Sequence, residues 1–384
     1  MIEEASIHIA GGTTMRIVVV GAGLAAGTAG TELREQGYDG ELIVLGAEPH
    51  APYERPPLSK GYLLGNDPIE NAFVHDAGWY AEHNVELRTS TTVTAIDPGR
   101  HEVTVDGETL SYDKLLLATG AEPRRLRMAD ESGTPTAYLR TIEDSDRLKV
   151  AFAAGAKVGI IGAGWIGLEV AAAARTAGCE VTIFEQAELP LVAVLGPEVA
   201  QAFADLHRAH GVDLRLGAAV SADDLQPFDL VVVGIGAVPS TGLAEAAGLA
   251  VDNGVLVNAQ LQTSDPDIYA IGDIANEDHP VLGRRIRVEH WDTAIEQGKT
   301  AAHNLLGAQE AYDRLPYFFT DQYDLGMEYV GSVGPGGYDR VDIEGDLHGA
   351  FQAYWVKDGQ VVAAMQANDW DASEVIKESL GSSR

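Results

Sequence analysis

The sequence predicts an α/β fold made of two similar βαβ units and a smaller α+β segment toward its end. One pattern occurs twice: a short run rich in Val and Ile, a glycine turn, and an Ala-rich stretch of helical character. The copies begin at Arg16 and Lys157, about one domain's length apart. From Leu315 onward, short β-type runs separated by turns indicate strands that close with a helix.

The order of the predicted elements supports this division. Each glycine turn leads into a helix and then into a second apolar strand, which completes a βαβ unit. The predicted elements are a strand over 16–20, a helix to about 35, a strand over 41–45, a Pro-rich loop over 49–57, a hairpin at Asp106-Gly107, a strand over 114–118, a strand over 157–161, a helix to about 177, strands over 181–184, 230–233 and 268–271, a helix over 293–306, strands over 352–356 and 360–364, and a helix near 372–380.

The glycine turns have the spacing that a bound pyrophosphate requires. The first Gly allows the tight bend, the second lets the backbone approach the phosphates, and the third small residue lets the helix pack closely at its positive N-terminus. One match is a weak signal, but two in strand–turn–helix context indicate two Rossmann-like dinucleotide-binding units. The matching residues are Gly21, Gly23 and Ala26 in the first turn and Gly162, Gly164 and Gly167 in the second.

A carboxylate at the end of the second strand of such a unit accepts hydrogen bonds from ribose hydroxyls. In the second unit this residue is Glu185, followed by Gln186 rather than Arg. Because a carboxylate repels a 2′-phosphate, we expect this unit to prefer NADH to NADPH. In the first unit the nearest acid is Glu48, and a solvated loop acid is the alternative for it.

Composition excludes several function classes. The chain has 58 acidic and 26 basic residues and a formal charge of -32, which argues against binding nucleic acid or anionic lipid. A high-salt protein and an ordinary acidic cytosolic protein are both compatible with it. Cys179 is the single cysteine, so intramolecular disulfides, Cys-rich metal sites and redox cysteine pairs are excluded, and no metal site is predicted.

The first residues of the chain and its apolar runs indicate where in the cell the protein is expected. No apolar run reaches the roughly 18 residues of a membrane-spanning helix. Residues 1–14 lack a secretory signal pattern, so we expect a cytoplasmic protein. Since the first strand pattern starts at Met15, we expect residues 1–14 to be an extension or Met15 to be the true start; an extra edge strand is the alternative.

Several further motifs resemble one family. They are the run Pro52-Tyr-Glu-Arg-Pro-Pro-Leu-Ser-Lys60, Ala118-Thr-Gly120, Ala270-Ile-Gly-Asp273, and Glu289-His-Trp291 before Gln297-Gly298. Together they resemble the FAD-dependent, NADH-using ferredoxin reductases of bacterial oxygenase systems, which serve putidaredoxin, rubredoxin or the biphenyl-dioxygenase ferredoxin. The resemblance runs from about Met15 to the C-terminus, and apoptosis-inducing factor is a more distant relative.

This resemblance implies a glutathione-reductase-like architecture. The first unit, completed by a later segment, holds FAD, the inserted second unit holds NADH, and the tail caps the flavin. The implied domains are 15–121 with 248–310 for FAD, 122–247 for NADH, and 314–384 for the C-terminal α+β domain.

The resemblance also implies the site residues. Lys60 lies near flavin N5 and pairs with Glu169, and these two are the candidate catalytic residues. Glu169 sits in an apolar helical stretch, where an unpaired charge would be costly. Asp273 hydrogen-bonds the ribityl chain, in agreement with its place at the carboxyl end of a buried strand. The candidate cofactor-binding residues are Gly21, Gly23, Ala25, Ala26, Glu48, Arg55, Lys60, Val93, Ala118, Thr119, Gly120, Arg140, Gly272, Asp273, Glu289 and Trp291 for FAD, and Gly162, Gly164, Ile166, Gly167, Glu185 and Gly236 for NADH.

Some of these assignments have structural alternatives. The alternative roles are a helix N-cap for Asp273 and a surface position for Lys60. For Arg55 the alternative is an ion pair within the loop, and for Trp291 it is packing in the core. Two departures from the family pattern stand out. This chain reads Phe318-Phe-Thr-Asp-Gln322 where members often show Phe-Trp-Ser-Asp-Gln, and Ala47 stands where close relatives carry the ribose acid.

The implied activity is transfer of a hydride from NADH to flavin N5, followed by single-electron transfer to a ferredoxin or rubredoxin. The loop over 49–60 lacks the cysteine of the disulfide reductases, so thiol chemistry is excluded. Two arginine clusters, Arg124-Arg125-Arg127 and Arg284-Arg285-Arg287, are candidate docking patches, and pairing with carboxylates or FAD phosphates is their alternative. A quinone or dye reductase and a redox-sensing protein resembling apoptosis-inducing factor remain the alternative functions.

Overall fold

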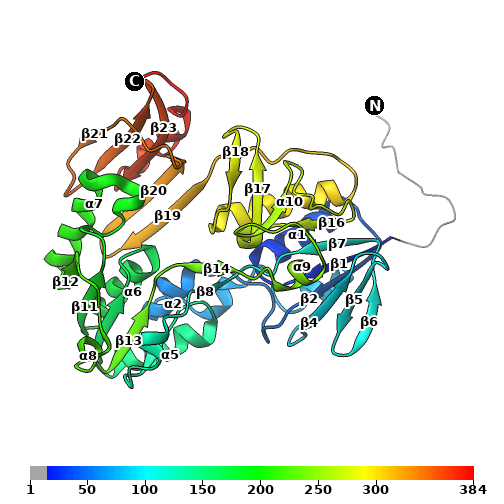
Figure 1. The fold of residues 1–384 in the computed structure, drawn as a ribbon, viewed down its shortest axis with the longest axis horizontal. Helices are drawn as coiled ribbons and strands as arrows, with labels where there is room; N and C mark the ends of the chain where they lie inside the picture. The colour runs from blue at the N-terminus through cyan, green and yellow to red at the C-terminus, as the bar shows by residue number, and fades with distance from the viewer. Residues whose placement is uncertain (1–14) are drawn as a thin grey trace.

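The structure is a computed structural model that describes residues 15–384. The prediction for residues 1–14, an extension or an edge strand, lies outside the described residues. Within the described part, two parallel sheets stand side by side and an antiparallel sheet lies against the second of them (Figure 1). The predicted α/β fold with an α+β tail is confirmed.

The first sheet is built from apolar runs that are buried on both faces, as parallel strands require. One edge strand of this sheet, over residues 268–270, comes from far along the chain. The segment after residue 248 therefore returns to the first unit. In sheet order the strands are β16 (Ile268–Ala270), β7 (Lys114–Leu117), β1 (Arg16–Val20), β2 (Glu41–Leu45) and β3 (Val85–Arg88), all parallel.

Helices α1 (Leu24–Glu35) and α10 (Trp291–Leu305) pack closely beside this sheet. The contact depends on Gly298, where an added Cβ would lie 2.9 Å from the Ala25 carbonyl oxygen. The Pro-rich loop that follows β2 forms a 3₁₀ helix over Pro56–Ser59. The other short helices of this region are α2 (Gly61–Leu64), a 3₁₀ turn over Ile69–Ala72, α3 (Trp79–Glu82) and α9 (Gly242–Ala246).

Two small sheets flank the first unit. The hairpin predicted at Asp106-Gly107 is confirmed and belongs to an antiparallel sheet of three strands. The strands of that sheet are β4 (Val93–Asp97), β5 (Glu102–Val105) and β6 (Glu108–Ser111). The second small sheet consists of β15 (Val255–Val257), β17 (Ala275–His279) and β18 (Arg284–Ile286).

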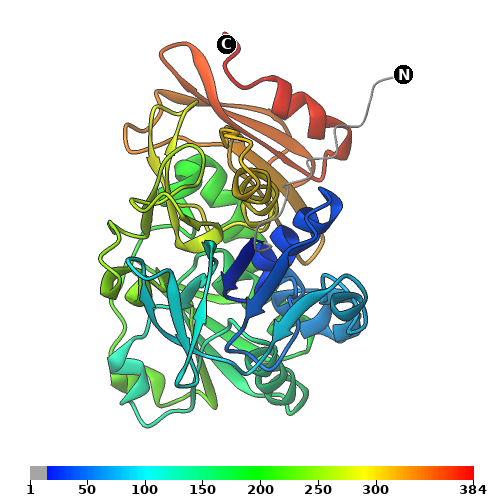
Figure 2. The same ribbon diagram turned by 90° about the vertical axis from the view of Figure 1, so that its right-hand side faces the viewer.

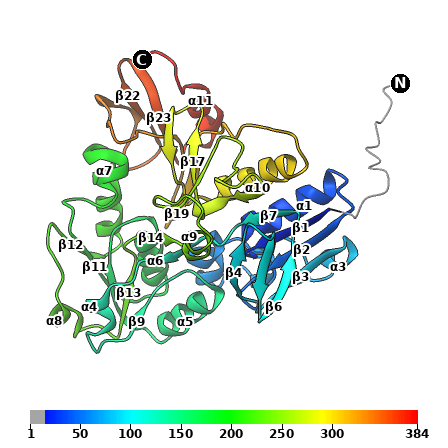
Figure 3. The same ribbon diagram turned by 45° about the vertical axis from the view of Figure 1, so that its right-hand side comes forward.

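The second unit repeats the construction of the first. The strands of its parallel sheet are, in order, β12 (Asp213–Leu216), β11 (Glu180–Glu185), β10 (Lys157–Ile161), β13 (Leu230–Val233) and β9 (Thr136–Ala137). Its helices are α4 (Arg127–Asp130), α5 (Ile142–Ala153), α6 (Trp165–Thr176), α7 (Val192–Ala209) and α8 (Ala222–Leu225). The antiparallel pair β8 (Ala121–Pro123) and β14 (Ala237–Pro239) runs between the two units (Figure 1), and β14 is also labelled in Figure 3.

The C-terminal segment is an antiparallel sheet with a terminal helix, drawn orange to red across the top of Figure 2. One face shares a core with the second unit, where the Trp355 indole donates to the Leu195 carbonyl of α7 at 3.0 Å. The strands are, in order, β19 (Tyr317–Gln322), β20 (Leu325–Gly331), β23 (Gln360–Ala367), β22 (Phe351–Lys357) and β21 (Arg340–Gly345). A 3₁₀ turn over Trp370–Ala372 leads into α11 (Ser373–Glu378).

Replacing Gly21 by Ala tests the first glycine turn. The residue has φ +109°, and a Cβ would lie 2.2 Å from the Ala118 carbonyl oxygen. Gly37 has φ +81° and open space around it, so Gly37→Ala carries backbone strain alone. We expect Gly37→Ala to lower the free energy of unfolding by about 1 kcal/mol and Gly21→Ala by about 3 kcal/mol, since a backbone clash adds to the strain. Urea unfolding followed by circular dichroism measures both. Equal losses would show that the approach of β7 does not constrain this turn.

Candidate active site

One large cavity of about 1180 Å³ lies where the carboxyl ends of the two parallel sheets meet. Its walls come from both glycine turns, the Pro-rich loop, the region around β18, and β19 of the C-terminal sheet. The cavity is therefore large enough for a sizeable ligand, and all three parts of the chain contribute residues that could contact it. The predicted residues that line it are Gly21, Gly23, Ala25, Glu48, Arg55, Lys60, Val93, Ala118, Thr119, Gly120, Arg140, Gly164, Ile166, Glu169, Gly236, Gly272, Asp273, Glu289 and Trp291.

Four of the predicted residues do not line this cavity. Ala26 is fully buried behind the first turn, and Gly162 and Gly167 form the second turn itself. A Cβ on Gly162 would lie 2.3 Å from the Gly234 carbonyl oxygen, and one on Gly167 would lie 2.1 Å from the Gly162 carbonyl oxygen. These three positions thus shape the turns. Glu185, the fourth, lies at the end of β11.

The second glycine of each turn has a different environment. A Cβ on Gly23 or Gly164 would meet no atom within 4 Å, so the backbone at both positions faces open space. Each of these residues caps a twelve-residue helix, α1 or α6, and no side chain of residues 15–384 bonds the free helix amides. Free amides at a helix N-terminus beside open space suit a phosphate group. Both turns therefore fit a dinucleotide pyrophosphate.

The two candidate ribose acids are held differently. The Glu185 carboxylate accepts from the backbone amides of Ala163 at 2.8 Å and Ala187 at 2.9 Å, which fixes it beside the second turn. The Glu48 carboxylate accepts a hydrogen bond from the Tyr53 hydroxyl. It also accepts from the Arg55 guanidinium at 2.9 Å. Glu48 is therefore a partnered acid at the cavity wall, and the loop ion pair considered for Arg55 is present.

Lys60 and Glu169 meet across the cavity wall. The Lys60 ammonium lies 2.7 Å from the Glu169 carboxylate, which is only 4% exposed on α6. Ser59 and Thr320 also donate their hydroxyl groups to this carboxylate. Three donors therefore compensate a charge that would cost several kcal/mol if it were buried alone.

A second ion pair lies near the end of β16. Arg140 bonds the Asp273 carboxylate at 2.6 Å, and Arg287 donates to the Asp273 carbonyl at 3.0 Å. The alternative that Asp273 begins an α-helix is wrong, because the chain makes only a 3₁₀ turn there and continues into β17. Asp273 thus remains at the mouth of the cavity.

Polar atoms without partners face the same space. Within residues 15–384, Arg140 Nε and Arg287 Nε are buried and lack a hydrogen bond, and both residues line the cavity. Buried polar groups of folded proteins are normally paired, so a polar group that enters the cavity is the natural partner. These atoms, with the two open glycine turns, fit the polar and phosphate groups of FAD.

Aromatic rings form the wall contributed by β19. Phe319 meets Trp291 edge to face at 6.0 Å between ring centroids, and the Lys60 ammonium lies 5.3 Å from the Phe319 ring. Phe318 packs on Trp165 of α6 at 4.7 Å. The segment in which the sequence departs from the family pattern thus supplies two rings to the cavity.

The single cysteine is remote from this chemistry. Cys179 is fully buried, and its thiol contacts the Phe152 carbonyl. Burial raises the pKa of the Cys179 thiol, which disfavours the reactive thiolate. Its environment is that of a small structural residue.

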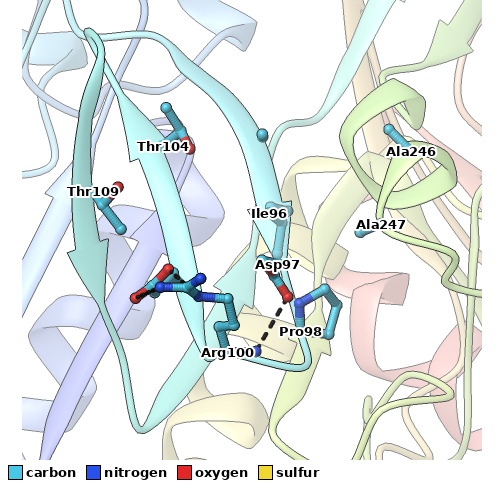
Figure 4. Close-up of a pocket in the computed structure, with 10 residues that line it drawn as sticks. Ile96, Asp97, Pro98, Arg100, Thr104, Thr109, Ala246 and Ala247 are labelled. Carbon is cyan, nitrogen blue, oxygen red and sulfur yellow. Dashed lines mark hydrogen bonds and ion pairs between the residues drawn. The ribbon is translucent and has the colours of Figure 1, made fainter.

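A second pocket, of about 600 Å³, lies between the hairpin sheet and α9 (Figure 4). Its lining includes Asp97, whose carboxylate accepts from the Arg100 amide, and Ala246 and Ala247 of α9. It contains none of the predicted site residues.

The arginine clusters are mostly paired. Arg125 bonds Asp130, the last residue of the short helix α4, and Arg127 bonds Glu131, which follows that helix. Both arginines remain largely exposed. The residues of the second cluster, Arg284, Arg285 and Arg287, line the cavity and donate to Ser332, to backbone carbonyls and to Glu289.

A buried network beside the end of β16 was not predicted from the sequence. The Gln297 amide donates to the Glu277 carboxyl at 2.9 Å and accepts from the Gly272 amide at 2.8 Å. Glu277 is 3% exposed, and burial raises its pKa to about 8. The network supports the turn that carries Asp273. The quoted family motif contains Gln297, but nothing in the sequence indicated its partner Glu277.

Comparisons with known proteins agree with this geometry. Residues 15–298 match the family model described as pyridine nucleotide-disulphide oxidoreductase. The chain is 41% identical to the ferredoxin--NAD(+) reductase component of the anthranilate 1,2-dioxygenase system of Burkholderia cepacia, over 91% of this chain and 90% of that protein. It is 37% identical to putidaredoxin reductase of Pseudomonas putida, over 92% and 88%.

Solved structures give the same result. The putidaredoxin reductase–putidaredoxin covalent complex contains a chain that superposes with a TM-score of 0.90 at 35% identity, over 97% of this chain and 95% of that one. The ferredoxin reductase of the CYP199A2 system of Rhodopseudomonas palustris has a TM-score of 0.86 at 34% identity, over 92% and 91%. This chain therefore belongs to the pyridine nucleotide-disulphide oxidoreductase family. The resemblance to ferredoxin reductases and the glutathione-reductase-like fold are confirmed.

Glu277→Gln tests the buried network through pH. Between pH 4.5 and about 8 the folded protein holds a proton on Glu277 that the unfolded chain has lost, so unfolding releases a proton and stability falls as pH rises. The variant lacks this titration. We expect the free energy of unfolding of the variant, relative to that of the wild type, to rise by up to about 1 kcal/mol per pH unit between pH 5 and 8.

Urea unfolding at several pH values measures this difference. The exposed Glu108→Gln serves as a control, for which the difference from the wild type should stay constant with pH. A constant difference for Glu277→Gln as well would mean that Glu277 is already ionised in the folded state at neutral pH.

Proposed function

We propose that this protein is an FAD-dependent NADH:ferredoxin oxidoreductase that passes electrons to a small iron-sulfur carrier. The observation that carries the proposal is the single cavity that joins two open glycine turns and contains the Lys60–Glu169 pair between them. The names of the relatives, a ferredoxin--NAD(+) reductase component and putidaredoxin reductase, support the same activity. When bound, FAD accepts a hydride from NADH and supplies single electrons to the carrier.

The first unit holds FAD in this proposal. The Gly23 backbone and the free amides of α1 bind the pyrophosphate, Asp273 binds the ribityl chain, and Glu48 binds the ribose. Arg140 orients the Asp273 carboxylate through their ion pair. The other residues assigned to FAD are Gly21, Ala25, Ala26, Arg55, Val93, Ala118, Thr119, Gly120, Gly272, Glu289 and Trp291.

The second unit holds NADH. The Gly164 backbone and the free amides of α6 bind its pyrophosphate, and Glu185 accepts from its adenosine ribose. Because Glu185 already accepts from two backbone amides, its carboxylate is fixed in place before the ligand arrives. Gly162, Ile166, Gly167 and Gly236 complete the set.

Lys60 and Glu169 act as a charge pair rather than as an acid and a base. The ammonium is held at the cavity wall by a buried carboxylate and favours negative charge on the flavin. The ring wall of Phe318, Phe319 and Trp291 limits water at this place. The protein thus supplies position and electrostatics, and the ligands supply the chemistry.

The proposal includes the organisation and location of the protein. We assign residues 15–121 with 248–310 to the FAD domain, 122–247 to the NADH domain and 314–384 to the C-terminal domain. None of the helices formed by residues 15–384 is long and apolar enough to cross a bilayer. We place the protein in the cytoplasm, where an iron-sulfur carrier and NADH are both available.

An anaerobic titration tests the function. One equivalent of NADH should bleach the visible absorption of the bound flavin, and a small iron-sulfur protein added afterwards should restore it one electron at a time. A colourless protein that takes up no flavin on reconstitution would contradict the proposal. A reduced form that persists with every iron-sulfur carrier would instead favour a redox sensor, and turnover with quinones or dyes alone would favour a quinone reductase.

Glu185→Ser tests the nicotinamide preference. Loss of a charge-assisted hydrogen bond should lower kcat/KM for NADH by about tenfold to a hundredfold. Loss of the repulsion between the Glu185 carboxylate and the 2′-phosphate should leave kcat/KM for NADPH equal or higher. The ratio of kcat/KM for NADH to that for NADPH should therefore fall. Glu188→Ser, which removes an exposed acid three residues further on, is the matched control. An unchanged ratio in Glu185→Ser would exclude Glu185 as the ribose acid.

A further inference from the structure

Strand β19 carries the segment in which this chain departs from the pattern of the ferredoxin reductases. Side chains alternate along a strand, so Thr320 and Gln322 share one face. Both are buried, at 1% and 0% exposed. Thr320 reaches Glu169 on α6, and Gln322 reaches His207 on α7. This face of β19 therefore connects two helices of the second unit.

The polar groups on this face form one continuous chain of hydrogen bonds. The chain begins at Glu169, whose carboxylate accepts a hydrogen bond from the Thr320 hydroxyl at 2.5 Å. The Thr320 oxygen in turn accepts from the Gln322 amide nitrogen at 3.3 Å. The Gln322 amide oxygen lies 2.9 Å from His207 Nε2, and His207 Nδ1 lies 3.4 Å from the Tyr323 hydroxyl. Tyr323 is partly exposed, so the chain runs from the surface to the Lys60–Glu169 pair.

The carboxylate decides the direction of every bond in this chain. An ionised carboxylate only accepts, so Thr320 donates to Glu169 and its oxygen is left to accept from Gln322. The Gln322 oxygen then faces His207, which must donate from Nε2. Burial lowers the pKa of His207 to about 4, so the ring is neutral and its Nδ1 accepts from Tyr323. All the donors point toward Glu169.

We propose that His207, acting through Gln322 and Thr320, is a positioning residue that holds the Glu169 carboxylate and thereby the Lys60 ammonium. The inference rests on the function proposed above, in which Lys60 faces the flavin. Aligned hydrogen bonds polarise one another, so each donor strengthens the next toward the carboxylate.

The same chain is not a proton path. An amide that took up a proton at its oxygen and released one from its nitrogen would be left as an imidic acid tautomer, which is unfavourable. Gln322 therefore transmits orientation and not protons. His207 acts at a distance on the charge at the cavity wall, although it does not itself line the cavity.

A cycle of variants tests this chain in the flavin-loaded protein. Thr320→Val removes the last donor and His207→Leu removes a donor two links away. We expect the rate constant for flavin reduction by NADH, measured in a single anaerobic turnover, to fall about tenfold in Thr320→Val and about threefold in His207→Leu. The Kd for NADH, from the concentration dependence, should stay within twofold.

The double variant separates positioning from general structural damage. If His207 acts only through the chain, Thr320→Val with His207→Leu should react at the rate of Thr320→Val alone. His207→Gln, which restores an N–H donor, should recover the wild-type rate within twofold. His210→Gln, which alters the neighbour stacked on Tyr323, should also stay within twofold. Multiplying effects in the double variant, or no recovery in His207→Gln, would overturn the proposal.

A second readout does not depend on activity. The ¹⁵N chemical shifts of the His207 ring in the wild-type protein should report a neutral ring protonated at Nε2. A ring protonated at Nδ1 would overturn the proposed direction of the chain, even if all variants failed to fold. Failure of the wild type to be reduced by NADH would contradict the proposed function instead, and would leave this tautomer test intact.

Discussion

A single buried carboxylate connects the three parts of this molecule. Glu169 lies on α6 of the second unit, bonds Ser59 and Lys60 of the first, and accepts from Thr320 of the C-terminal sheet. Its charge is too costly to bury without these donors, so the three parts must meet at this point. The meeting point is also a wall of the cavity. The requirement to satisfy one charge therefore places a cation between the two nucleotide units.

The glycine turns set a second constraint, which acts on the backbone alone. In each unit the first glycine passes against a carbonyl of a neighbouring strand or its extension, while the second faces open space. Two free helix N-termini consequently face open space, and the turns before them contain no basic side chain. In the proposed function, these helix N-termini let a chain with a formal charge of -32 bind two polyanionic ligands. The local field at each turn comes from peptide dipoles, and the surface charge is screened by salt over about 10 Å.

The sequence predicted the local features well because they depend on short-range rules. Strand, turn and helix in each unit follow from hydrophobic period and glycine spacing, and their bounds differ by only a few residues from those in the structure. The resemblance to ferredoxin reductases supplied the Lys60–Glu169 pair, which no local pattern indicates. Networks formed by residues far apart in the chain were missed. Glu277 with Gln297, and His207 with Gln322, have no spacing rule, because only the packing of strands on helices brings them together.

The two missed networks have a common physical logic. In each, a glutamine amide bridges a buried acid or imidazole to a group nearer the cavity, donating on one side and accepting on the other. An amide cannot change its charge, so it passes on orientation without adding to the electrostatic potential of the cavity. A charge placed near a flavin alters its reduction potential. The two amide bridges satisfy buried polar groups without adding charge, whereas additional lysines or carboxylates at the same places would add it.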